Sequence, residues 1–267
     1  MTAGERVTLA LIWAIAIGAV VFLLAPLAVA VAVSFGASAV FTLPPPAWSL
    51  RWYERLAATP GLADAALLSL EIAALSTAIS LVLGTLCAIG VVRGRWRGRA
   101  AVATFMVSPL MLPGLVLGIA LLQFLRGIVD LRDAWWSLLV AHVVITMPYV
   151  MRTVLASLSL FDFSLLDAAR TLGCSWPRAI LRVLVPALAP AFLTAGLFAF
   201  LASMDNYPIS IFFTDARTKT LPIQMLQYVE ETPDPTIAAI SACLILLTVA
   251  VMLIADRLVG LRRLAEF

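Results

Sequence analysis

Six blocks of apolar residues, separated by polar segments, decide what this chain can fold into. A helix needs about 20 mostly apolar residues to span the hydrocarbon core of a bilayer. The blocks that fit this requirement are residues 7–33, 62–92, 101–125, 135–151, 184–213 and 236–254. The pattern predicts an all-α membrane protein with six transmembrane helices.

The composition excludes a soluble domain. Hydrophobic residues make up 63% of the 267 positions and charged residues only 12%, whereas soluble domains carry about 45–50% and about 25%. The three cysteines have no spacing typical of a metal or redox site, so we expect no cofactor. The chain also lacks the Gly-x-x-x-x-Gly-Lys-Ser/Thr pattern that cradles nucleotide phosphates, so we expect no ATPase activity from it.

The first apolar block is far longer than the apolar core of a secretory signal peptide, which has about 7–15 residues. We therefore expect it to remain in the protein as a helix. Residues 1–61 would form this helix and an outer loop, and residues 62–258 a transmembrane core of five helices. Residues 259–267 would form a cytoplasmic tail.

The distribution of basic residues predicts the orientation of the chain, because Lys and Arg are enriched in cytoplasmic loops. The clearest basic segment is 93–99, with arginines at positions 93, 95, 97 and 99. With the N-terminus inside, the inner segments carry about twice as many Lys and Arg residues as the outer ones. Both termini and the central loop, residues 158–183, are therefore predicted to be cytoplasmic.

The central loop contains a short predicted helix from Ser164 to Leu172. Ser164 would cap its start, with Asp167 three residues later completing a pattern like a capping box. Ala168 and Ala169 are small and permit close backbone approach. Gly173 is placed to end the helix in a left-handed conformation, which costs glycine little.

The spacing of this loop resembles the EAA loop of the inner-membrane permeases of bacterial ABC importers of type I. That pattern is Glu-Ala-Ala, three residues, Gly, nine residues, Ile-x-Leu-Pro, and here Asp167 stands in place of the Glu. Val183, Val185 and Pro186 match its end. The resemblance implies a MetI-like permease fold in which the loop forms a coupling helix that docks in a groove of an ATPase. The implied coupling residues are Asp167, Ala168, Ala169 and Gly173.

The resemblance also implies a set of partners. A cytosolic ABC ATPase dimer would hydrolyse ATP, and a second permease subunit would complete the pathway. A periplasmic substrate-binding protein would dock on the outer loops. The chain would be a multi-pass protein of the bacterial inner membrane, in contact with the lipid bilayer and not with nucleic acid.

Acidic residues within the apolar blocks are the candidates for the substrate pathway. An ionisable residue in a span is expensive and suggests a functional site. Asp205 and Asn206, next to Pro208, would form an anionic spot beside a helix break that attracts a cationic substrate. The alternative is that Asp205 lies near the outer interface, where it caps a helix end or pairs with an arginine. Glu71 is a weaker candidate in the second block.

The segments around Met204, Thr220-Leu221-Pro222 and residues 234–241 are similar to the polyamine (spermidine/putrescine) branch of these permeases. That branch usually has two adjacent acidic residues where this chain has Asp205 and Asn206. The resemblance implies a polyamine or similar small cationic solute as substrate. Related branches that carry ferric iron, thiamine or opine-like compounds share much of the pattern.

Two other classes of membrane protein fit the sequence less well. A secondary transporter predicts inverted repeats, and no convincing internal repeat is present. An intramembrane enzyme needs paired catalytic groups, whereas His142 is the only histidine and lies in a different span from Asp205. We expect His142 to be a packed, hydrogen-bonded residue.

Overall fold

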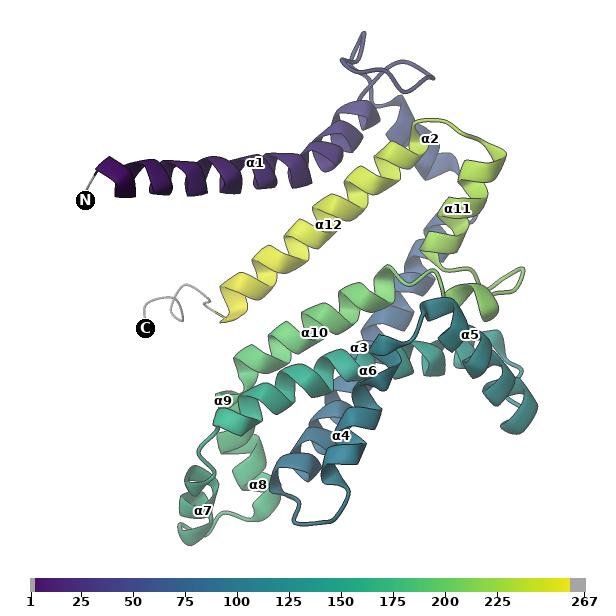
Figure 1. Ribbon diagram of the computed structural model, residues 1–267. Helices are drawn as coiled ribbons and strands as arrows, with labels where there is room; N and C mark the ends of the chain where they lie inside the picture. The colour runs from purple at the N-terminus through teal and green to yellow at the C-terminus, as the bar shows by residue number, and fades with distance from the viewer. Residues whose placement is uncertain (1–2, 260–267) are drawn as a thin grey trace. The chain divides into compact units, whose positions relative to one another are not determined.

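The computed structural model describes residues 3–259, which Figure 1 shows as a succession of helices. No strand occurs in this range, where the one isolated bridge pairs Gly36 with Trp48. Four helices are long and apolar enough to cross a membrane: α1 (Ala3–Ser34), α3 (Leu62–Arg93), α6 (Ala134–Leu160) and α12 (Thr236–Val259). They confirm four of the predicted spans, and α6 continues nine residues beyond its predicted end at residue 151.

The two remaining spans are bent pairs of helices. The first pair comprises α4 (Arg99–Val107) with η1 (Ser108–Met111), then α5 (Gly114–Gln123) with η2 (Phe124–Ile128). The second comprises α8 (Trp176–Ala179), η3 (Ile180–Leu184) and α9 (Val185–Ala187), then α10 (Ala189–Met204). The bends are 112° and 73°, and counting each pair as one span gives six.

Both bends lie within apolar blocks predicted as spans, residues 101–125 and 184–213. The first interruption lies at Leu112, which has an extended backbone between Pro109 and Pro113. Proline has no N–H to donate and clashes with the preceding turn, which accounts for the break. The second helix ends at Met204, and only the 3₁₀ turn η4 (Ser210–Phe212) follows it. The break expected beside Pro208 is confirmed.

Two segments predicted as loops contain helices. α2 (Arg51–Ala58) holds the buried Trp52, whose indole N–H donates to the carbonyl of Gly36 over 2.7 Å. α11 (Leu221–Glu231) buries Leu221 and Ile223 in its first turn. The first segment was predicted as a loop from its three consecutive prolines and the second from its charged residues, although each buries apolar side chains. The predicted tail lies, apart from residue 259, outside the described residues.

The chain divides into two compact units. One contains residues 3–62 and 225–249, and the other residues 63–224 with the end of α12. In the first unit Asp234 lies 3.2 Å from the guanidinium of Arg55 and accepts the backbone N–H of Thr236, which starts α12. The second unit holds all seven candidate site residues.

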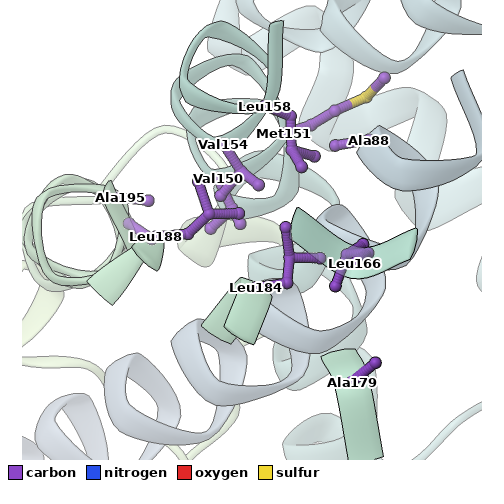
Figure 2. Packing of buried hydrophobic residues seen from close by; sticks show 11 residues of the cluster. Ala88, Val150, Met151, Val154, Leu158, Leu166, Ala179, Leu184, Leu188 and Ala195 are labelled. Atoms are coloured by element: carbon purple, nitrogen blue, oxygen red, sulfur yellow. The ribbon is translucent and has the colours of Figure 1, made fainter. Parts of the chain in front are cut away.

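The larger unit has its core along α6. Figure 2 labels most of the buried residues of this cluster. They come from α3, α6, the central loop, the segment 184–188 that follows it, and α10: Ala88, Val150, Met151, Val154, Leu158, Leu166, Ala179, Leu184, Leu188 and Ala195. The helices α6 and α10 run side by side. The central loop therefore shares a core with the membrane helices.

Candidate functional sites

The first candidate site is the helix of the central loop, α7 (Ser164–Thr171). Its start is fixed by Asp162, whose carboxylate accepts the backbone N–H of Ser164 over 2.9 Å and its hydroxyl over 2.8 Å. These two hydrogen bonds lower the pKa of Asp162 below its ordinary value. The predicted capping box of Ser164 with Asp167 is wrong, because Ser164 lies inside the helix and gives its hydroxyl to Asp162.

The end of α7 is as the sequence predicts. Gly173 has a φ of 87°, in the left-handed region. Its N–H donates to the carbonyl of Arg170, and the N–H of Cys174 donates to that of Ala169. This pair of bonds is a Schellman motif, which satisfies the last carbonyls of a helix. A Cβ on Gly173 would meet no atom within 4 Å, so the backbone conformation alone favours glycine here.

The two faces of α7 differ in what they contact. Leu166 is 1% exposed and belongs to the cluster of Figure 2. Asp167 and Ala168 are exposed, and so are Leu165 at 50% and Leu172 at 86%. The helix is thus anchored to the core on one side and offers a carboxylate, a small residue and two leucines on the other. An exposed apolar patch of this kind suits contact with another protein.

Arg93 ties the end of α3 to the central loop. Its guanidinium lies 5.2 Å from the centre of the Phe163 ring and 4.7 Å from that of Trp176. Arg170 approaches the same Trp176 ring at 5.9 Å. The sequence alone predicts Arg93 only as part of the basic segment 93–99. The aromatic residues on either side of α7 were the available signal for this contact.

The second candidate site is the break after α10. Asp205 occupies the C-cap position, and its backbone N–H donates to the carbonyl of Leu201. The side chain is exposed and, among the described residues, makes no ion pair or hydrogen bond. Asp205 therefore lies beside the break, and in the same range its side chain neither caps the helix end nor pairs with an arginine. The C-terminal end of a helix carries partial negative charge, to which the Asp205 carboxylate adds.

The side-chain oxygen of Asn206 is engaged in a hydrogen bond at the break and is not a free acceptor. Its Oδ1 accepts the backbone N–H of Ile209 over 3.1 Å, which closes a turn. Glu71 is exposed on α3. Asp205 and Asn206 are consecutive residues and both lie at the break. In the described residues no hydrogen bond or ion pair joins Glu71 to either of them.

A buried strip of polar side chains lies behind this break. His142 of α6 is 1% exposed, and its Nδ1 lies 2.7 Å from Ser203 Oγ and its Nε2 2.9 Å from Ser210 Oγ. On α3, Ser76 lies 3.3 Å from Ser203 and Ser80 lies 2.7 Å from Thr146. The prediction that His142 is packed and hydrogen-bonded is confirmed.

Two glycines of α5 bring that helix against the other side of the break. A Cβ on Gly114 would lie 2.9 Å from Cβ of Pro208. A Cβ on Gly118 would lie 2.5 Å from a ring carbon of Phe212 and 3.2 Å from the carbonyl of Pro208. The segment after α10 is therefore held between α5 and α6, and neither contact was predicted from the sequence.

The chain is similar in sequence to a family of membrane proteins and to individual members of it. Residues 80–263 match the family described as binding-protein-dependent transport system inner membrane component. The spermidine/putrescine transport system permease protein PotC of Haemophilus influenzae is 31% identical over 209 residues, which are 78% of this chain and 81% of PotC. The putrescine transport system permease protein PotI of Escherichia coli is 31% identical over 231 residues, or 84% and 82% of the two chains.

Solved structures show the same fold. A chain of a bacterial ABC transporter involved in the import of the acidic polysaccharide alginate superposes with a TM-score of 0.69 at 15% identity, covering 97% of this chain and 98% of that one. A chain of the MetNI methionine ABC transporter gives a TM-score of 0.60 at 19% identity, covering 74% and 94%.

Proposed function

Because the chain belongs to the family of binding-protein-dependent transport system inner membrane components, we propose that it lines half of the route by which a polyamine or similar small cationic solute enters the cell. It is a multi-pass permease subunit of an ABC importer in the inner membrane. Family membership favours this reading over a secondary transporter. A second, related permease chain would supply the other half of the route.

The coupling function is assigned to the exposed face of α7. Asp167 and Ala168 are exposed there, Ala169 is half-buried, and Gly173 ends the helix. With both termini inside, as the basic residues indicate, this face would meet a cytosolic ATPase dimer. ATP hydrolysis would then occur on those separate subunits. Leu166 supports the proposal because it connects α7 to the core of the membrane helices.

The substrate class is assigned from the charge at the break after α10. The exposed carboxylate of Asp205 at the negative end of a helix is the observation that carries this proposal. Broken helices with backbone carbonyls at membrane depth are a recurring way to hold cations. The names of the relatives, which are spermidine and putrescine permeases, point the same way. A periplasmic binding protein would deliver the solute to the outer loops.

The substrate is tested by uptake in the native host. The chain would be deleted and restored, and the uptake of labelled spermidine, putrescine, thiamine, ferric iron and an opine measured in each strain. We expect polyamine uptake to fall on deletion and to return with the restored chain. If polyamine uptake is unchanged and that of another solute is lost, the polyamine proposal is wrong while the family assignment stands.

The role of Asp205 is tested in the same strains with Asp205→Asn. Uptake at limiting polyamine should fall about tenfold or more, because an interaction with a charged group contributes about 1.5–3 kcal/mol. Asp64→Asn is the matched control, since Asp64 is an exposed aspartate in the first turn of α3, away from the break. Equal uptake by both variants, at equal amounts of protein, would remove Asp205 from the pathway.

A further inference from the structure

We propose that His142 is a positioning residue for substrate binding: its imidazole bridges the two sides of the break after α10 and thereby sets the place of the Asp205 carboxylate. The inference rests on the proposed role of Asp205. It adds a residue that makes no contact with the substrate and acts through the backbone on which Asp205 is mounted.

The bridge is defined by its two ends. Ser203, bonded to Nδ1 of His142, is two residues before Asp205 and still within α10. Ser210, bonded to Nε2, is five residues after it and begins η4. Both serines are buried, at 3% and 0% exposure. A single rigid ring thus joins the last turn of the helix to the segment that follows the break.

The direction of each hydrogen bond follows from the number of protons available. The Ser210 hydroxyl donates its proton to the backbone carbonyl of Asn206. Its oxygen must therefore accept from His142, which places the imidazole hydrogen on Nε2. Nδ1 is then an acceptor, and the Ser203 hydroxyl donates to it. The neutral imidazole therefore donates one hydrogen bond, to Ser210, and accepts one, from Ser203.

The same chain of bonds reaches the residues at the break. The main-chain carbonyl of Asn206 accepts a hydrogen bond from the Ser210 hydroxyl, and its side-chain Oδ1 accepts one from the N–H of Ile209. The backbone immediately after Asp205 is thus fixed from His142 through Ser210. An apolar residue at position 142 would leave two buried hydroxyls without this partner, and buried unpaired polar groups are costly. The segment would move to recover hydrogen bonds, and Asp205 with it.

A purely structural role and a positioning role predict different kinetics. If His142 only stabilises the fold, its replacement reduces the amount of folded importer and leaves the KM for substrate unchanged. If it positions Asp205, replacement raises the KM at an equal amount of folded importer. Glutamine can both donate and accept at the end of its side chain, so His142→Gln should restore part of the bridge.

The test measures polyamine uptake kinetics with the complete importer for His142→Leu, His142→Gln and Asp205→Asn. We expect His142→Leu to raise the KM about tenfold with little change in maximal rate, which is the effect of losing one well-placed hydrogen bond or ion pair. His142→Gln should stay within about threefold of the native KM. The variant with both His142→Leu and Asp205→Asn should have a KM no higher than the worse single variant, because both changes act on one interaction.

Smaller changes keep the test decisive if His142→Leu does not assemble. Ser210→Ala removes one end of the bridge, whereas Ser80→Ala removes a hydroxyl of the same buried strip that bonds Thr146 and not His142. Ser210→Ala should raise the KM and Ser80→Ala should not. Two results overturn the inference: an unchanged KM in both His142→Leu and Ser210→Ala, or equal effects of the two serine variants.

The failures of the two proposals are distinguishable. If Asp205→Asn raises the KM and the His142 and Ser210 variants do not, the positioning role is wrong and the proposed function stands. If Asp205→Asn has no effect on the KM, the role of Asp205 fails, and this inference with it.

Discussion

The guanidinium of Arg93, the last residue of α3, lies 4.7 Å from the centre of the Trp176 ring at the start of α8. The same group lies 5.2 Å from the ring of Phe163, which precedes α7. One side chain of a long membrane helix therefore contacts aromatic residues on both sides of the proposed coupling helix. A cation over an aromatic face is attracted to the ring by about 0.5–1 kcal/mol at exposed sites.

Replacing Arg93 by Gln should loosen this connection and reduce the uptake obtained per ATP hydrolysed by about two- to fivefold, the equivalent of one exposed cation–π contact. The measurement is simultaneous ATP hydrolysis and polyamine uptake by the reconstituted importer. Arg95→Gln is the control, because it removes the same charge two residues further along the basic segment, where Arg95 is exposed. A similar loss in both variants would assign the effect to net charge and not to the aromatic contacts.

Gly173→Ala should weaken the association with the ATPase. A side chain in the left-handed conformation costs about 1–2 kcal/mol, and the strain falls on the Schellman motif that ends α7. We expect severalfold less ATPase to co-purify with the variant in mild detergent. Gly90→Ala is the control: its Cβ would also meet open space, but Gly90 lies inside α3 and has no left-handed φ.

The same co-purification tests Asp167, whose carboxylate is exposed on α7. Asp167→Lys reverses a charge on the proposed docking face and should abolish recovery of the ATPase. It should leave the fold intact, since no ion pair in the described residues depends on it. Normal recovery with both Asp167→Lys and Gly173→Ala would mean that α7 is not the coupling element.

The sequence predicts those features that depend on neighbouring residues. The four long spans, the bounds of α7 and the left-handed Gly173 follow from apolar runs and from a glycine at the end of a helix. The capping residue of α7 was mispredicted, because Asp162 and not Asp167 accepts the Ser164 N–H, and the local pattern does not rank the two. The bridge from His142 to Ser210 spans 68 positions, and the contact of Gly118 with Phe212 depends on a bend whose angle no local pattern gives.

The cap at Asp162 should be insensitive to pH in the physiological range. Its pKa is lowered because the charged carboxylate accepts two hydrogen bonds from Ser164. Such a group stabilises the helix start above the ordinary aspartate pKa of about 4, and the contribution is lost only as the pH falls through the lowered value. Hydrogen exchange of the Ser164 amide, measured from pH 5 to 8 and corrected for its intrinsic rate, should show constant protection in the native chain.

Asp162→Ala should remove that protection at every pH, and Asp162→Asn should keep part of it, because the amide oxygen still accepts the Ser164 N–H. Asp215, another exposed aspartate with a lowered pKa, caps the turn at residues 217–218 and is the control. Asp215→Ala should leave the Ser164 amide protected. Protection that survives in Asp162→Ala would show that the start of α7 is held by Leu166 and the core alone.

Gly118→Ala tests whether the break after α10 is held by close packing. The added Cβ would lie 2.5 Å from Phe212 and 3.2 Å from the carbonyl of Pro208, so either the ring or the backbone must move. Overpacking of this kind typically costs about 1–3 kcal/mol, and thermal unfolding of the purified importer should begin several degrees lower. Gly196→Ala on α10 is the matched control, because its Cβ would make only ordinary contacts at 3.5 and 3.8 Å.

If the importer also loses affinity for substrate in Gly118→Ala and not in Gly196→Ala, the packing of α5 contributes to the placement of Asp205. Unchanged stability and affinity in Gly118→Ala would mean that Phe212 turns aside without moving the break.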